Sequence, residues 1–243
     1  MDISIPEAIL LLAIDDETGK PVVSDSAVGM AFAAGAAAQL VLQGRIRISG
    51  VDATDAKPGT FVSGDGQADE RLEPLVEHLV GRTPEDALGK IVGFNGPGAP
   101  AGKLRAQTLE DFDAAGLLAR RDQKLLGITF GRRWERGARI EVEDALQARA
   151  RKILQGVGAT GDASPEAVQR DAVLAAALAI LHTVEALPKV FPELPEEQVV
   201  AAGQALAADD WASETVRDSL QALEGAMVAI MVTTVIVPTI VTS

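Results

Sequence analysis

The sequence predicts a mainly α-helical, compact, bundle-like domain with small β-hairpins, and three observations support this prediction. Hydrophobic residues make up 47% of the 243 residues, which is enough for a sizeable core. Aromatic residues make up only 3%, so aliphatic side chains must fill that core. Helix-favouring segments rich in Ala and Leu recur along the chain, and no long polar linker separates its halves. We therefore expect one helical domain over residues 1–243.

The first segment predicts two helices joined by an acid-rich turn. Pro6 suits the first turn of a helix because its missing N–H has no partner there. The unbroken apolar run 9–12 predicts that this helix is buried on nearly every side. The turn over 15–19 ends in Gly19, which readily adopts a positive φ. Helix-favouring residues then continue over 27–42.

Two places in the chain show a helix followed by a glycine and then a hairpin. Gly44 ends the helix at 27–42, and the alternating segment 45–48 predicts a half-buried strand that returns at 60–62. Gly116 likewise ends a helix expected from Leu104, and residues 117–134 predict short strands that form a second hairpin. A helix that leads into a small hairpin is similar to a winged-helix element, and either a duplication or a common way of ending a helix would explain the repeat.

The remaining elements are predicted to be helices separated by breakers. Thr83 and Pro84 indicate a helix start, with Thr83 as the N-cap. Further helices are expected over 67–80, 141–155 and 164–187, from Pro195, and from Ser213 into the apolar tail.

The order of these segments resembles the Golgi phosphoprotein family. The features that carry the resemblance are the Leu-rich start, the acidic turn with its glycine, the helix ending in Leu42-Gln43-Gly44-Arg45, and the segment Ala115-Gly116-Leu117-Leu118. The resemblance covers most of residues 3 to about 235. It implies a helical fold and lipid binding, because eukaryotic members bind phosphatidylinositol 4-phosphate on Golgi membranes.

The resemblance also implies where a lipid headgroup would bind. The family pocket uses one Trp and three Arg, and these positions fall on Ser24, Ala33, Gly102 and Arg105. Only Arg105 matches, and one arginine cannot supply the multivalent contacts that a phosphoinositide needs. Arg105 is therefore a candidate headgroup residue, its alternative being an ordinary surface position on a helix, and specificity for phosphatidylinositol 4-phosphate is not expected.

A basic segment stands out in an acidic chain of net charge −13. Between residues 120 and 139, seven basic residues face two acidic ones, which gives +5 here and −18 elsewhere. Arg132, Arg133 and Arg136 are expected near a hairpin tip that carries Phe130 and Trp134. Arginine binds phosphates and Trp favours the bilayer interface, so these five side chains are candidates for headgroup binding and membrane contact. The alternatives are a solvated hairpin whose arginines pair with the excess acids, and a contact with protein or RNA. The seven basic residues are Arg120, Arg121, Lys124, Arg132, Arg133, Arg136 and Arg139.

The composition argues against several other functions. The chain has no cysteine, which excludes thiol catalysis, and only two histidines, His78 and His182, which excludes a multi-histidine metal centre. It has no G-x-S-x-G nucleophile motif or phosphate loop, so we expect neither an enzyme nor a cofactor. The net charge of −13 makes nucleic-acid binding unexpected.

The uncharged tail 225–243 allows three interpretations: a core helix, a self-association surface or a membrane anchor. The first residues include no basic segment, and their apolar run is too short for a signal peptide, so we expect a cytosolic protein that associates peripherally with membranes. We expect it to bind anionic membrane lipids peripherally and reversibly, and to act as an adaptor for a protein cargo. The alternative is an oligomerisation or partner-binding module that makes no lipid contact.

Overall fold

A computed structural model describes residues 3–16, 18–51, 53–54, 56–93, 98–125, 128–160, 172–208 and 214–235. Within these ranges, 122–125, 128–132, 157–160, 214–216 and 232–235 are described by their backbone alone. The helices are α1 (Ile5–Ala13), α2 (Asp25–Leu42), α3 (Glu73–Leu79), α4 (Pro84–Val92), α5 (Pro100–Ala114), α6 (Ile140–Thr160), α8 (Ala172–Thr183), α9 (Leu187–Val190), α10 (Glu196–Ala208) and α11 (Glu214–Val235). The strands are β1 (Ile46–Ile48), β2 (Phe61–Ser63), β3 (Leu118–Leu125) and β4 (Ile128–Arg136). The prediction of a mainly helical fold with small hairpins is confirmed.

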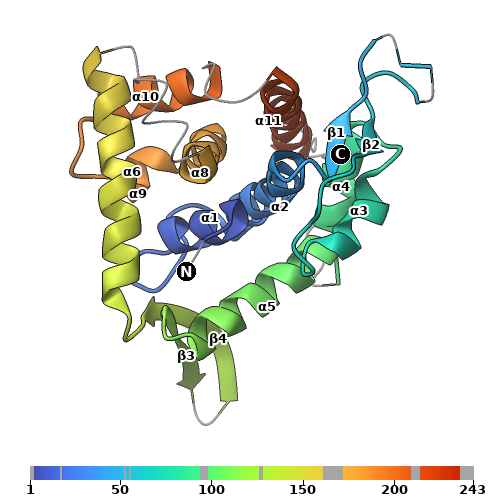
Figure 1. Ribbon diagram of the computed structural model, residues 1–243. Coiled ribbons are helices and arrows are strands. Elements are labelled where there is room, and N and C mark those ends of the chain that lie inside the picture. Colours follow the sequence, from blue (N-terminus) through green and yellow to red (C-terminus); the bar gives the residue numbers. More distant parts are fainter. Residues whose placement is uncertain are drawn as a thin grey trace, which may run out of the picture.

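Two helices, α1 and α2, lie at the centre of the fold (Figure 1). Every residue of α1 is buried, as its apolar sequence predicts, and the helix packs against α2, α6 and α8. Helix α2 runs beside it and contacts α4, α5, α8 and α11, which surround the pair. Among the described residues, α2 is the one helix long and apolar enough to cross a bilayer, and 72% of it is buried within the fold.

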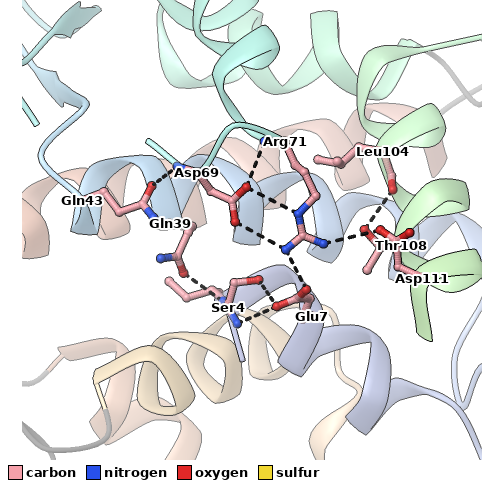
Figure 2. A network of polar contacts seen from close by, with 10 residues as sticks. Ser4, Glu7, Gln39, Gln43, Asp69, Arg71, Leu104, Thr108 and Asp111 are labelled. Atoms are coloured by element: carbon pink, nitrogen blue, oxygen red, sulfur yellow. Dashed lines mark hydrogen bonds and ion pairs between the residues drawn. The ribbon is translucent and has the colours of Figure 1, made fainter. Parts of the chain in front are cut away.

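The N-terminus of α1 is held by a network of polar side chains (Figure 2). Glu7, which is 5% exposed, accepts hydrogen bonds from the backbone N–H of Ser4 at 2.8 Å and from Arg71 Nη2 at 3.0 Å. Arg71 also contacts Asp69 and Asp111, so one guanidinium joins α1, the chain before α3, and α5. Because a buried carboxylate needs such partners, the network is what allows Glu7 to lie in the core.

Both predicted helix–glycine–hairpin units are present, and their corners have the same hydrogen bonds. Gly44 (φ +66°) follows α2, and Gly116 (φ +71°) follows α5. The residue after each glycine donates its N–H to the carbonyl five residues earlier, at 2.9 Å in both units. This arrangement satisfies carbonyls at the helix end and requires a left-handed residue, which glycine adopts without a steric cost.

The two hairpins that follow differ in length and register. In the first, β1 pairs antiparallel with β2, as the sequence predicts, and the register places Ile48 opposite Phe61. In the second, β3 and β4 are much longer, and their register places Arg120 opposite Trp134 and Asp122 opposite Arg132. A bulge lies at Gln123 and Lys124. Figure 1 shows the first hairpin lying against the helices and the second extending away from the end of α5.

Two helices begin at other residues than the sequence predicts, and the structure shows where the described part of the tail lies. Helix α3 begins at Glu73 rather than near 67, because Pro74 fits only the first turn of a helix. Helix α5 begins at Pro100, four residues before the expected Leu104. The described part of the tail forms the second half of α11, where Ala226 and Met227 are buried in the core and Val228 is 46% exposed, so one face of this segment is a core helix. Residues 236–243 lie outside the described part.

Candidate functional site

A cavity of about 680 Å³ lies beside the base of the second hairpin. Its walls come from the end of α1, the following turn, the start of α2, the end of α4, the first half of α5, and β4. Twelve of its lining residues are apolar or glycine, and four are polar or charged. The lining residues are Leu10, Ile14, Gly19, Lys20, Pro21, Asp25, Ser26, Val28, Gly29, Val92, Ala101, Gly102, Arg105, Ala106, Leu109 and Trp134.

Arg105, the predicted headgroup residue, lies in this cavity and pairs with Asp25. Its Nη2 is 2.5 Å from Asp25 Oδ1, and its Nη1 is 3.1 Å from Oδ2, so the contact is bidentate. The Arg105 side chain is only 18% exposed, and its Nε is buried without a hydrogen-bond partner in the described part of the chain. The hydrogen bond from Arg105 holds the pKa of Asp25 below its usual value, so this carboxyl stays ionised at neutral pH.

Several other features of the cavity favour a negative charge. Lys20 is exposed on its wall. The first residues of both α2 and α5 line the cavity, and α5 has no side-chain cap, since Ala99 occupies the N-cap position. Uncapped N-terminal N–H groups carry partial positive charge, which favours nearby anions.

The base of the second hairpin forms one wall of the cavity. Trp134 lines it and is half-buried against the core, and its backbone N–H donates to the carbonyl of Gly19 at 3.1 Å. Gly19 has φ +62°, and a Cβ there would lie 3.0 Å from the Trp134 oxygen, so the contact requires glycine. The expectation that Trp134 lies near the hairpin tip is wrong, because β4 ends at Arg136, only two residues further on.

Arg136 also lies at the base, where acids surround it. Its guanidinium contacts Asp16 at 3.5 Å, Glu143 at 3.2 Å, and Asp144. Burial, together with the nearby Asp16, raises the pKa of Glu143 to about 7, and the attraction of Arg136 opposes this shift. Arg136 therefore ties the hairpin to the turn after α1 and to α6, and the expectation that it lies near the tip is wrong.

The rest of the basic segment is partly neutralised. Arg121 pairs with Glu135 at 2.9 Å across the two strands, and Arg139 lies 3.6 Å from Glu141. Arg133 stands opposite Arg121 in the register and is half-buried. The backbone of Phe130 and Arg132 is part of β4, but their side chains, like that of Lys124, lie outside the described residues. When the acids at the base are included, seven basic residues face six acidic ones.

The four positions taken from the family pocket have different surroundings. Gly102 and Arg105 line the cavity, and Ser24 is the N-cap of α2, where its Oγ accepts the N–H of Ala27 at 3.2 Å. Ala33 is completely buried within α2 and lies outside the lining. The cavity thus shares two positions with the expected pocket.

The comparison with protein families agrees with the order of elements. A family model described as Golgi phosphoprotein 3 (GPP34) matches residues 5–223. The chain belongs to the Golgi phosphoprotein 3 family. The match includes α1 to α10, both hairpins, and the first ten residues of α11, so it contains every residue that lines the cavity. No curated protein matched the chain.

Sequence reasoning found Arg105 but missed its partner and its surroundings. Asp25 is 80 residues away from Arg105, and its position in the first turn of a helix is explained equally well by helix capping. The apolar lining gave no signal, because Leu10 and Val28 also fit ordinary core positions. Asp16 and Glu143 were missed because nothing in a single sequence indicates that they lie beside Arg136.

Proposed function

We propose that this protein binds anionic membrane surfaces peripherally through its second hairpin, with the mouth of the cavity beside it. The observation that carries the proposal is the placement of β3 and β4. These strands extend away from the helical body, while Trp134 and Arg136 fix their base to it (Figure 1). A firmly held projection can touch a flat surface that the body, with its excess of acids, would be repelled from.

The charge on the hairpin is sufficient for weak binding. Besides Arg136, the two strands carry five basic residues, which are Arg120, Arg121, Lys124, Arg132 and Arg133. A basic residue near an anionic leaflet contributes about 1 kcal/mol. Because the two acidic residues of the strands, Asp122 and Glu135, offset two of the five positive charges, we expect a total of roughly 3 kcal/mol, which is enough for reversible attachment and is lowered by salt.

Lipid selectivity would come from the cavity rather than from the hairpin. Lys20 and Arg105 are its cations, and Asp25 opposes them. This balance differs from the three arginines and one tryptophan of the family pocket, so we propose binding to anionic lipid in general and not to phosphatidylinositol 4-phosphate in particular. An adaptor role, in which the attached protein holds a cargo at the membrane, follows as part of the proposal.

Co-sedimentation with vesicles tests the proposal directly. The full chain should bind vesicles of phosphatidylcholine with 30% anionic phosphatidylglycerol at low salt, and it should be released as salt rises. The double substitution Arg132→Gln and Arg133→Gln should weaken binding roughly 10- to 30-fold, because two phosphate contacts are lost. A matched control replaces the exposed Lys152 and Lys189 by Gln, which changes the net charge equally on α6 and α9. Equal losses in both double variants, or no binding at low salt, would refute the proposal.

A further inference from the structure

We propose that the cavity beside Arg105 binds one acyl chain that ends in a single negative charge. This inference goes beyond the proposed function, because it depends on the lining of the cavity and not on the cations of the hairpin. It concerns a free amphiphile, such as a fatty-acid anion, whose charge and chain are complementary to two different parts of the same cavity.

The size and lining of the cavity fit an apolar chain. Its volume of about 680 Å³ falls in the range of roughly 300–1,000 Å³ that is typical of small-molecule sites. The wall contains Pro21 and Val92, which are half-buried and therefore present apolar surface to the cavity. The half-buried Trp134 adds a flat apolar side. A hydrocarbon chain along these residues buries apolar surface on both sides, whereas a polar group has partners only at the charged side chains of the lining.

The charges of the lining select one negative charge. Lys20 and Arg105 are positive and Asp25 is negative, so the charged side chains that line the cavity sum to +1. Arg105 is already engaged by Asp25 in a bidentate pair, and the lowered pKa of Asp25 keeps that carboxylate ionised. A second negative charge on the ligand would therefore meet Asp25 without a free cation to balance it.

The arrangement of these groups also gives the ligand a direction. Lys20 and Asp25 are exposed, whereas Pro21, Val92 and Trp134 are half-buried. The anionic end would lie at the exposed rim beside Lys20 and the uncapped N-terminus of α5, and the chain would lie along these three apolar side chains. Ala106 lines the cavity from α5 at an exposed helical position, which makes it a suitable place to fill the space without altering any charge.

Calorimetric titration of the full chain with decanoate tests the chain site. Decanoate should bind saturably with one site, and affinity should rise about fourfold for each methylene added from octanoate to dodecanoate. Ala106→Phe should weaken binding at least tenfold by occupying the cavity. Gln107→Phe, at the exposed neighbouring position that does not line the cavity, should leave affinity within twofold of wild type. Absent binding, or equal affinities in the two Phe variants, would overturn the proposal; circular dichroism confirms that both variants are folded.

A second arm tests the selection of one charge. At pH 8 decanoate carries one charge and decyl phosphate carries nearly two. Wild type should prefer decanoate, and Asp25→Asn should reverse the order by improving decyl phosphate at least fivefold. Lys20→Gln should weaken both anions, whereas Lys90→Gln, at an exposed position of α4 outside the lining, should weaken neither. An unchanged preference in Asp25→Asn would overturn the charge assignment. Vesicle binding is read separately, so loss of the proposed membrane function would not affect either arm.

Discussion

The chain contains two helix–glycine–hairpin units that share a corner and differ in their strands. At both corners the N–H that follows the glycine bonds to the carbonyl five residues earlier. The first unit then turns into the core, where Ile46 and Phe61 are completely buried. The second buries Leu117 and Leu118 at its base and continues outward as two long strands.

This difference shows that the corner does not determine whether the hairpin after it packs into the core or extends away from it. In the first unit, the outer edge of β2 is covered, because Phe61 exchanges backbone hydrogen bonds of 2.8 Å with Gly81 and Arg82. In the second unit, polar contacts to Asp16, Gly19 and Glu143 hold only the base. Apolar residues in the strands therefore make the first hairpin structural, and charged residues leave the second available for a surface.

The largest difference in stability is expected when one aromatic side chain in each unit is replaced by alanine. Phe61→Ala should lower the free energy of unfolding by about 3–5 kcal/mol, because it empties a fully buried position. Trp134→Ala should cost only about 1–2 kcal/mol, since this ring is half-buried and borders a cavity. Urea unfolding followed by circular dichroism measures both values. Equal losses would show that the second hairpin belongs to the core as much as the first.

A smaller effect is the pH dependence of stability, which we expect from the base of the second hairpin. Glu143 contacts Arg136 at the base of the second hairpin, and its pKa of about 7 lies above the ordinary value of 4.5. The folded state therefore binds a proton that the unfolded state has released, and stability should fall as pH rises from about 5 to 8.5. The loss from this group should be on the order of 2–3 kcal/mol.

Glu143→Gln should remove that part of the pH dependence, because an amide cannot release a proton. Glu141→Gln is the matched control, since this neighbouring carboxylate is 71% exposed. Urea unfolding at pH 5.5 and 8.5 measures the difference between the two variants. The same pH dependence in Glu143→Gln as in wild type would show that the base of the hairpin is not held through this group.

The local signals of the sequence predicted the fold well. Gly44 and Gly116 marked both corners, and Thr83 marked the start of α4, because caps and left-handed residues depend on chemistry within a few residues. The start of α3 was placed too early, since Leu72 precedes it without a side-chain cap and only Pro74 fixes the first turn.

The candidate site was predicted only in part, because it depends on contacts between distant segments. Arg105 was identified, but the bidentate pair with Asp25 joins residues 80 positions apart. The places of Trp134 and Arg136 were predicted incorrectly, because the length and register of the strands decide which residues reach the tip. The turn after α1 meets the hairpin through Gly19, and nothing local in the sequence indicates that contact.

The central claim is that the outer part of the second hairpin makes the membrane contact. Arg121 stands opposite Arg133 in the register, so residues 122–132 can be replaced by an Asn-Gly turn that joins these two positions. This change keeps the anchors at Trp134 and Arg136 and shortens the second hairpin toward the length of the first.

Co-sedimentation of this shortened protein with anionic vesicles at low salt is the most direct test. The account predicts an unfolding midpoint close to that of the full chain, unchanged decanoate binding, and vesicle binding at least tenfold weaker, because Lys124, Phe130 and Arg132 are removed. Vesicle binding as strong as that of the full chain would contradict the account, because the attachment would then come from another face of the protein.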